Sequence, residues 1–477
     1  MAAFTAEATA PVEHGDPRVK GAGSPCDVLY LALEGQRPLA CGARYSLRGV
    51  REVAFGRGAM LSAKREGDKL VVTLPDDRVS SRHATLSRSG SGFVLTDEGS
   101  KNGTFVGLAR HTAGPVAVGA TFSLGACLFV LDEAVLPEDE RETTGLGLAG
   151  RREGVASLVP HVAAGLGRLV KIAASDLPVL LLGESGTGKE VLARAVHTLS
   201  TRGEGPLVAV NSGALTQTLV EAQLFGHVKG AFSGAVRDEP GYFRAAAGGT
   251  LLLDEIGDLP EGAQAVLLRA LETSEVTPVG ATRPIKVDVR VVSATLRPVE
   301  ALREDLRMRL AGYTHRLVPL RERRADLGIV IAELLPRIAP GRERAIRLSA
   351  EAVRAIGAHP FRLNVRELFQ VLKSAVVLAG EAGIVRAADL PEGFGTEAPP
   401  PVEKVVPPAK AVATKAPVPA EERKKVLLAL LAEHHGNLSE VARRMDTTRV
   451  QVHRWIDKFA IDVEVFRAGG AGGSGEG

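Results

Sequence analysis

The sequence predicts a multidomain chain with three folded units of different class: an all-β sandwich, an α/β domain and a small all-α unit. A chain of 477 residues is too long for a single hydrophobic core, so several domains are expected. Residues 25–135 alternate short apolar, β-branched runs with turns, which is typical of a sandwich. Residues 153–395 combine buried-strand runs with helical patterns, and residues 421–465 show helical spacing alone.

The composition limits the possible compartments and partners. The formal net charge is only +3, so any affinity for DNA must come from a local patch and from assembly. Cys26, Cys41 and Cys127 lack metal-ligand spacing and fit reduced thiols in a cytoplasm. The N-terminal residues lack a basic region followed by an apolar stretch, so no signal peptide is expected. No apolar run is long enough to span a membrane. We therefore expect a soluble, cytoplasmic protein without a membrane partner.

A glycine-rich loop lies between a predicted strand at 177–182 and a helical pattern at 191–199. The loop consists of Gly183, Glu184, Ser185, Gly186, Thr187, Gly188, Lys189 and Glu190. In this setting such loops bind nucleotide phosphates, because the glycines let backbone N–H groups face an anion and the lysine reaches the β- and γ-phosphates. A chance glycine-rich turn is the alternative, and the strand–helix context argues against it.

A second buried-strand pattern, at 249–255, ends in two carboxylates, Asp254 and Glu255. Asp254 is placed to hold Mg²⁺, through water, and Glu255 to orient or deprotonate an attacking water. Alone, such a pair is more often a solvated turn. Together with the glycine loop, it predicts hydrolysis of ATP with Mg²⁺ as the cofactor.

The stretch 221–235 resembles the AAA+ activators of sigma-54 RNA polymerase, the bacterial enhancer-binding proteins. Their signature loop reads Gly-Ala-Phe-Thr-Gly-Ala, and this chain has Gly230, Ala231, Phe232, Ser233, Gly234 and Ala235. The resemblance implies that the loop is pushed out when ATP binds and that it contacts sigma-54. Two glycines suit a mobile tip, and Phe232 has no obvious core to enter. A buried phenylalanine in an ordinary loop is the alternative. Ser233 keeps the hydroxyl of the family threonine and loses its methyl.

The resemblance extends over residues 150–395 and implies further roles at the nucleotide. Asn211 matches the residue that restrains the catalytic glutamate until nucleotide is bound. Arg303 and Arg309 match the arginines that reach the γ-phosphate of a neighbouring subunit, in a ring that is hexameric in the family. A solvated helix face is the alternative for both arginines.

A helical lid is also implied by the resemblance. The ATPase core then covers residues 153–335 and the lid 336–395, with Arg366 of the lid reporting bound nucleotide. One position departs from the family. An asparagine that senses the γ-phosphate should follow Thr295, but the chain has Leu296, so Thr295 alone carries the polar role there. This leaves a rival open, in which a DNA-binding repressor or scaffold binds ATP without useful turnover.

The N-terminal sandwich resembles a forkhead-associated (FHA) domain, which in its family binds phosphothreonine peptides. Four fragments carry this resemblance, and they begin at Gly56, Ser80, Asp97 and Asn102. Arg57 and Ser80 can bind phosphate, Arg82 can help, and Asn102 would hold the peptide backbone. His83 is expected to brace the loop. The alternatives are a sandwich without ligand and a signalling adaptor that recruits a phosphorylated kinase.

The C-terminal unit, 421–465, is similar to the Fis-type helix-turn-helix, and the proline-rich stretch 396–420 is expected to be its linker. The expected DNA contacts are Arg449, Gln451, His453, Arg454 and Lys458. A helical dimerisation tail is the alternative, and Trp455 is expected in the core. Residues 136–152 are expected to form another linker, and residues 1–24 and 466–477 to be disordered tails.

Together these features predict a sigma-54-dependent transcription activator gated by a phosphopeptide. Its expected partners are sigma-54 RNA polymerase, DNA upstream of a promoter, a phosphothreonine protein such as a Ser/Thr kinase, and further copies of itself.

Overall fold

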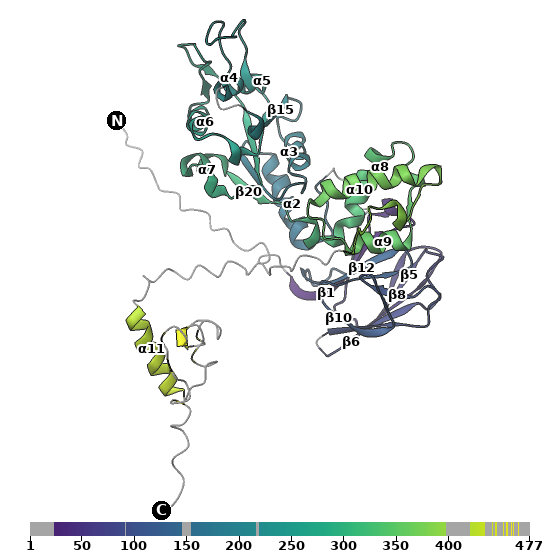
Figure 1. Ribbon diagram of the computed structural model, residues 1–477. Helices are drawn as coiled ribbons and strands as arrows, with labels where there is room; N and C mark the ends of the chain where they lie inside the picture. Colours follow the sequence, from purple (N-terminus) through teal and green to yellow (C-terminus); the bar gives the residue numbers. More distant parts are fainter. Residues whose placement is uncertain are drawn as a thin grey trace, which may run out of the picture. The chain divides into compact units, whose positions relative to one another are not determined.

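The computed structural model describes residues 23–90, 92–145, 154–215, 219–396 and 420–434, with scattered positions between 441 and 466. By its internal contacts the chain divides into two compact units, Met1–Pro400 and Pro401–Gly477. Figure 1 labels many of the helices and strands of these units.

The first unit begins with a β-sandwich. Within the described residues, its two sheets have the strand orders β13-β2-β1-β12-β11-β8-β9 and β10-β7-β6-β3-β5-β4. The strands are β1 Ser24–Glu34, β2 Ala43–Ser46, β3 Glu52–Arg57, β4 Ser62–Glu66, β5 Lys69–Leu74, β6 Ala84–Ser89, β7 Gly92–Asp97, β8 Thr104–Val106, β9 Ala109–His111, β10 Ala113–Val116, β11 Thr121–Leu124, β12 Cys127–Leu136 and β13 Glu142–Thr144. Alternate side chains enter the core, where Phe55, Phe122 and Phe129 meet with ring centroids 5.1–5.8 Å apart.

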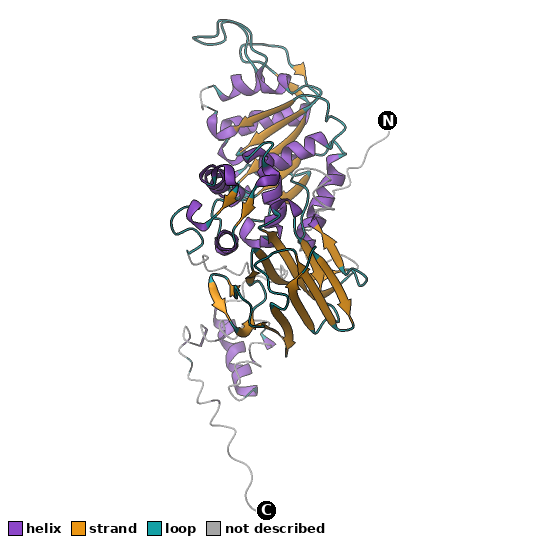
Figure 2. Cartoon of the chain, turned by 90° about the vertical axis from the view of Figure 1, so that its right-hand side faces the viewer, coloured by secondary structure: helices purple, strands orange, loops and turns teal. Residues whose placement is uncertain are grey.

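A parallel α/β sheet follows, with the order β15-β16-β19-β14-β20. Its strands are β14 Val179–Leu182, β15 Leu207–Asn211, β16 Thr250–Asp254, β19 Arg290–Thr295 and β20 Tyr313–Arg316. The helices that flank it (Figure 2) are α2 Pro160–Ala173, α3 Lys189–Thr198, α4 Val220–Phe225, α5 Gly241–Ala245, α6 Glu261–Thr273 and α7 Glu304–Leu310. A short pair, β17 Glu275–Val276 and β18 Ile285–Lys286, lies outside the sheet. Parallel strands deliver their carboxyl ends to one edge, which is where such sheets bind ligands.

Three helices form the lid: α8 Leu327–Ile338, α9 Ala350–Ala358 and α10 Asn364–Leu378. Two short parallel strands, β21 Arg347–Leu348 and β22 Ile384–Val385, accompany them. The hydroxyl of Ser349 caps α9 by accepting a hydrogen bond from the Ala352 N–H at 3.2 Å. Such a cap satisfies a backbone donor that the first turn of a helix leaves free.

The sandwich and the lid share a hydrophobic core. Val28, Tyr30 and Leu128 of the sandwich belong to the same buried cluster as the apolar residues of α8, α9 and α10. Two lid glycines permit the close approach. A Cβ at Gly328 would lie 2.6 Å from the Ala32 carbonyl oxygen, and one at Gly357 would lie 2.6 Å from the Leu128 side chain. The two domains are therefore packed as one body, which their sequences did not predict.

The second unit contains α11, Ala420–Glu433. Leu427 and Leu431 of this helix are buried with three later residues, and Trp455 packs against them, which confirms its expected place in a core. The candidate DNA contacts Arg449, Gln451, His453, Arg454 and Lys458 lie outside the described residues. The helix-turn-helix therefore stays a prediction.

In the described part of the chain, no helix is long and apolar enough to cross a membrane. The same residues contain no group of three or more His, Cys, Asp or Glu side chains that could hold a metal ion.

Candidate functional site

The glycine-rich loop connects β14 to α3 at the carboxyl edge of the parallel sheet. Gly186 and Gly188 have φ angles of 75° and 104°, in the left-handed region that favours glycine. The Lys189 side chain is only 7% exposed, and its Nζ donates to the carbonyl oxygens of Gly183 at 3.0 Å and Glu184 at 3.3 Å. The ammonium group is thus held at the loop by backbone carbonyls, as a buried charge requires.

The structure brings the two predicted carboxylates to this loop. Glu255 Oε1 lies 3.6 Å from the Lys189 Nζ, and Asp254 precedes it at the end of β16. Glu255 itself adopts a left-handed backbone with φ 50°, a conformation that non-glycine residues mostly adopt where the surrounding structure enforces it. Asp254 Oδ1 accepts the Glu255 N–H at 3.0 Å. The lysine, the aspartate and the glutamate therefore form one cluster.

Leu296, which stands where the family has an asparagine, directly follows β19. The Leu296 side chain is 52% exposed, and its backbone N–H donates to Glu255 Oε2 at 3.1 Å. The Thr295 hydroxyl is buried and accepts the Arg297 N–H at 3.0 Å. The polar contact from residue 296 to the Glu255 carboxylate is thus made by the backbone, while the side chain contributes no polar group.

Asn211 lies opposite Asp254 in the register of β15 and β16. Its Oδ1 accepts the Gly213 N–H at 2.9 Å, so the side chain caps its own turn in this structure. A restraint of Glu255 by Asn211 stays a prediction.

The lid rests directly on the glycine loop. Asn364 is fully buried; its Oδ1 accepts the Leu320 N–H at 2.8 Å, and its Nδ2 donates to Ser185 O at 3.0 Å and to Glu184 Oε2 at 3.1 Å. The Arg366 guanidinium donates to Ser185 Oγ at 2.9 Å. The first turn of α10 therefore contacts the loop, and the lid residue singled out in the sequence lies at the candidate phosphate site.

Sequence reasoning missed two partners of the loop. Arg321 forms a bidentate ion pair with Glu184, with N–O distances of 2.6 and 2.7 Å. This hydrogen-bonded pair outweighs burial and, with Asn364, lowers the pKa of the Glu184 carboxyl. Arg321 and Asn364 both lie within residues 150–395, the stretch that resembles the sigma-54 activators, and this resemblance was the one signal in the sequence that pointed to them. Neither residue was given a role from the sequence.

The two candidate trans-acting arginines lie at α7. The Arg303 guanidinium pairs with Asp305 at 2.7 Å, and that of Arg309 donates to the Leu271 carbonyl at 2.9 Å. These bonds lie near α6 and α7, and the Arg303 side chain is 40% exposed. Contact of these arginines with a neighbouring subunit stays a prediction.

The loop from residue 226 to 241 rises from the α/β domain between α4 and α5, at the top of Figure 1. The two ends of the loop meet at a pair of glycines, where a Cβ on Gly241 would lie 2.2 Å from the Gly226 nitrogen. At the tip, the Gly230 N–H donates to the Ala235 carbonyl at 2.8 Å. Phe232 is partly buried, and its ring centroid lies 4.9 Å from that of His227. Phe232 therefore has a local packing partner that the sequence did not predict.

The predicted phosphopeptide residues of the sandwich also come together. The Arg57 N–H donates to the Ser80 carbonyl at 2.9 Å, and the Ser80 hydroxyl accepts the Lys101 N–H at 3.1 Å. The Asn102 side chain donates to the Arg78 carbonyl at 2.7 Å. These bonds tie the loops after β3, β5 and β7 into one cluster with exposed Arg57 and Asn102 side chains.

His83 braces this cluster, as expected. It is fully buried, its Nδ1 accepts the Ser80 N–H at 3.0 Å, and its Nε2 donates to the Gly103 carbonyl at 3.3 Å. Burial lowers its pKa, in keeping with this neutral tautomer. Arg82, by contrast, is exposed and pairs with Glu98 at 3.4 Å.

Comparison with known proteins identifies the domains. Residues 53–125 match the FHA domain, residues 159–318 the Sigma-54 interaction domain and residues 321–405 the AAA+ ATPase lid domain.

Relatives with curated descriptions match over part of their length. The chain is 44% identical over 238 residues to the "Sigma54-dependent transcriptional activator SfnR" of Pseudomonas putida, covering 48% of this chain and 65% of that protein. It is 40% identical over 314 residues to the "Acetoin catabolism regulatory protein" of Cupriavidus necator, covering 64% of this chain and 47% of that protein. The chain thus spans about half to two thirds of the length of these relatives.

Among solved structures, NtrX from Brucella abortus in complex with ATP is 27% identical, with a TM-score of 0.45, and covers 65% of this chain and 70% of that one. The family models together assign an FHA domain, a sigma-54 interaction domain and an AAA+ lid to this single polypeptide.

Proposed function

We propose that this protein is a sigma-54-dependent transcription activator that hydrolyses ATP to remodel the closed complex of sigma-54 RNA polymerase. The observation that carries the proposal is that one domain holds two features. The first is the glycine-rich loop 183–190, a phosphate-binding loop (P-loop), with Lys189 3.6 Å from Glu255. The second is the 226–241 loop, which carries Phe232 and has glycines at its base. That domain matches the Sigma-54 interaction model over residues 159–318.

ATP fits the residues of the P-loop site. Among the described residues, no heavy atom beyond the chain neighbours lies within 4 Å of the position that a Cβ on Gly188 would occupy. The Lys189 ammonium contacts the carbonyl oxygens of Gly183 and Glu184 and the Glu255 carboxylate, which a phosphate can replace. Asp254 would hold Mg²⁺ through water, and the ion would neutralise charge on the β- and γ-phosphates. Glu255 would orient or deprotonate the attacking water.

Assembly into a ring would complete each site. Arg303 and Arg309 would reach the γ-phosphate held by the neighbouring subunit and stabilise the charge of the transition state there. The C-terminal unit would hold the ring at DNA upstream of the promoter.

The FHA domain would gate this activity by reading a phosphothreonine. Arg57 and Ser80 would bind the phosphate, and Asn102 the peptide backbone, because charged and hydroxyl donors of this kind suit a phosphate dianion.

Transcription from a supercoiled sigma-54 promoter template tests the proposal. Wild-type protein with ATP should form open complexes, and Phe232→Ala should abolish them while ATP hydrolysis persists. Val236→Ala is the matched control, because Val236 is 78% exposed in the same loop. Open complexes that form equally well with Phe232→Ala would refute the role of the loop.

A second candidate function follows from Leu296. With no polar side chain at this position, the protein would bind ATP but act as a DNA-binding regulator or phosphopeptide-signalling scaffold with little coupled hydrolysis. ATP binding without turnover, in wild-type protein supplied with DNA and phosphopeptide, would favour this alternative.

A further inference from the structure

The FHA domain borders the lid at the side that carries its peptide-binding loops. Arg78 lies in the loop between β5 and β6, two residues before Ser80, and its carbonyl is held by Asn102. Its guanidinium pairs with Glu351 in the first turn of α9 at 3.2 Å. A residue of the phosphopeptide cluster is thus bound to the lid.

Further contacts make this border a built interface. The Arg354 guanidinium of α9 lies 4.0 Å from the ring centroid of Phe105, which follows the Asn102 turn. The Leu348 N–H donates to the Gly35 carbonyl at 2.7 Å. Beneath these contacts lies the hydrophobic core shared by the sandwich and the lid. A disturbance at the Arg78 loop therefore acts on a packed lid, not on a flexible tether.

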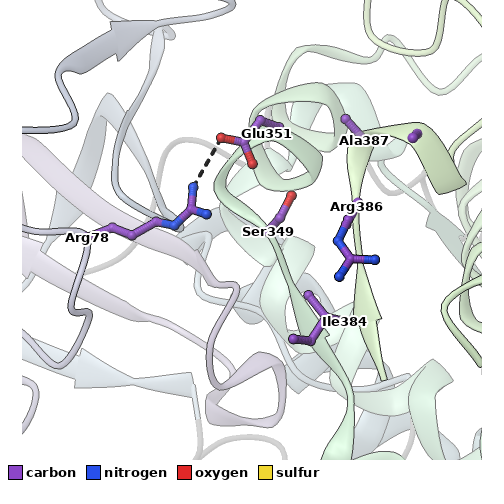
Figure 3. Close-up of a pocket in the computed structure, with 7 residues that line it drawn as sticks. Arg78, Ser349, Glu351, Ile384, Arg386 and Ala387 are labelled. Carbon is purple, nitrogen blue, oxygen red and sulfur yellow. Dashed lines mark hydrogen bonds and ion pairs between the residues drawn. The ribbon is translucent and has the colours of Figure 1, made fainter. Parts of the chain in front are cut away.

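A cavity of about 430 Å³, lined by charged and apolar residues, opens at this border (Figure 3). Arg78 lines it from the FHA domain, and Ser349, Glu351, Ile384, Arg386, Ala387 and Ala388 line it from the lid. The lining contains the guanidinium groups of Arg78 and Arg386 and a single carboxylate, that of Glu351, so its formal charge is positive and favours anions. Despite partial burial, hydrogen bonds from its own backbone and Ser349 and the charges of Arg78 and Arg354 lower the pKa of Glu351. Glu351 is therefore an ionised competitor for Arg78.

The Arg78–Glu351 pair can be exchanged for another anion. Both side chains are about half exposed, at 46% and 47%. Ion pairs with this exposure contribute little to stability, so an acidic group of a bound phosphopeptide can displace Glu351 from Arg78.

The other end of the lid lies on the P-loop. The N–H groups of Val365 and Arg366 donate to the Gly186 carbonyl at 3.0 and 3.3 Å. A Cβ at Gly186 would lie 2.1 Å from the Leu363 carbonyl oxygen, so the lid backbone packs too closely against the loop for any side chain at this position. A lid that is loosened at α9 would hold bound nucleotide less firmly at α10.

We propose that the lid surface around Glu351 is the second wall of the phosphopeptide site, so that phosphopeptide binding displaces Glu351 from Arg78 and speeds release of nucleotide from the P-loop. The proposal rests on the phosphothreonine recognition proposed above. By linkage, nucleotide must weaken phosphopeptide binding by the same factor by which the peptide weakens nucleotide binding.

The test measures release of fluorescent ADP from the full-length chain, with a degenerate phosphothreonine peptide library and its unphosphorylated twin. We expect release to be about two- to fivefold faster with the phosphorylated library, since one exposed ion pair is lost. Without peptide, Glu351→Gln should release ADP as fast as wild type does with the phosphorylated library. Adding that library should not increase the release rate of this variant further. Glu381→Gln, an exposed lid carboxylate in η8 (Gly380–Ala382), is the matched control and should behave as wild type.

The outcomes separate this inference from the proposed function. Fluorescence anisotropy first measures binding of the phosphorylated library to wild type and to Arg57→Ala. Binding that requires Arg57 but leaves nucleotide release unchanged would overturn the coupling alone. Equal acceleration in wild type and Glu351→Gln would also overturn it. No binding of the phosphorylated library to wild type would overturn both phosphothreonine recognition and the coupling.

Discussion

Asn364 is the residue whose replacement should most directly separate the lid from the glycine loop. It is fully buried, has a left-handed φ of 55°, and its side chain bonds to Leu320, Glu184 and Ser185. Asn364→Ala leaves the Leu320 N–H without its acceptor, at a cost of about 1–3 kcal/mol. Alanine in a left-handed conformation adds about 1–2 kcal/mol. The free energy of unfolding should therefore fall by roughly 2–5 kcal/mol.

Urea unfolding followed by circular dichroism measures this loss, and Asn364→Gly is the matched control. Glycine loses the same hydrogen bonds but accepts the left-handed backbone, so it should be more stable than the alanine variant by about 1 kcal/mol. Nucleotide affinity, measured in parallel, should fall in both variants because the lid is less firmly seated. An alanine variant within about 0.5 kcal/mol of wild type would refute the role assigned to these bonds.

Three further predictions concern hydrolysis and pH. Arg303→Ala should lower kcat by a factor of about 10³–10⁵ with nucleotide affinity retained, and mixing it with Lys189→Ala subunits should restore part of the phosphate release if the sites are shared. Leu296→Asn should raise the hydrolysis rate over wild type, whereas Leu296→Ala should not, because only asparagine supplies a polar side chain. Burial, with two nearby arginines, lowers the pKa of His315 from 6.5 to about 4. The free energy of unfolding should therefore be highest above pH 6.5 and fall by up to about 3 kcal/mol as the pH drops to 4, and His315→Gln should flatten this decline in urea titrations.

The arrangement of the candidate nucleotide site could be predicted from sequence because its geometry is local. A strand, a glycine loop and a helix fix the position of Lys189 without reference to the rest of the fold, and a second parallel strand delivers Glu255 to the same edge. The FHA cluster was predictable for a similar reason, since short motifs at the ends of strands mark turns that meet at one end of a sandwich.

The rest depends on contacts between residues far apart in the chain. The Glu184–Arg321 pair joins residues 137 positions apart, and no periodicity reports such a pairing. The left-handed backbone at Glu255 runs against the preference of glutamate and is imposed by tertiary packing. Asn364 tolerates the same conformation, but its place under the glycine loop is set by partners distant in the sequence. The Phe232–His227 contact required the loop to fold back on itself, which composition does not indicate.

The core shared by the sandwich and the lid changes how this protein can be dissected. Removing residues 1–150 would strip buried partners such as Tyr30 and Leu128 from α8 and α9 and expose the lid's apolar face to water. A fragment of this kind should aggregate or unfold. Its inactivity would then reflect a damaged lid and not the loss of a regulatory signal. Single substitutions on the FHA surface, which leave the common core intact, are the sounder route to separating sensing from catalysis.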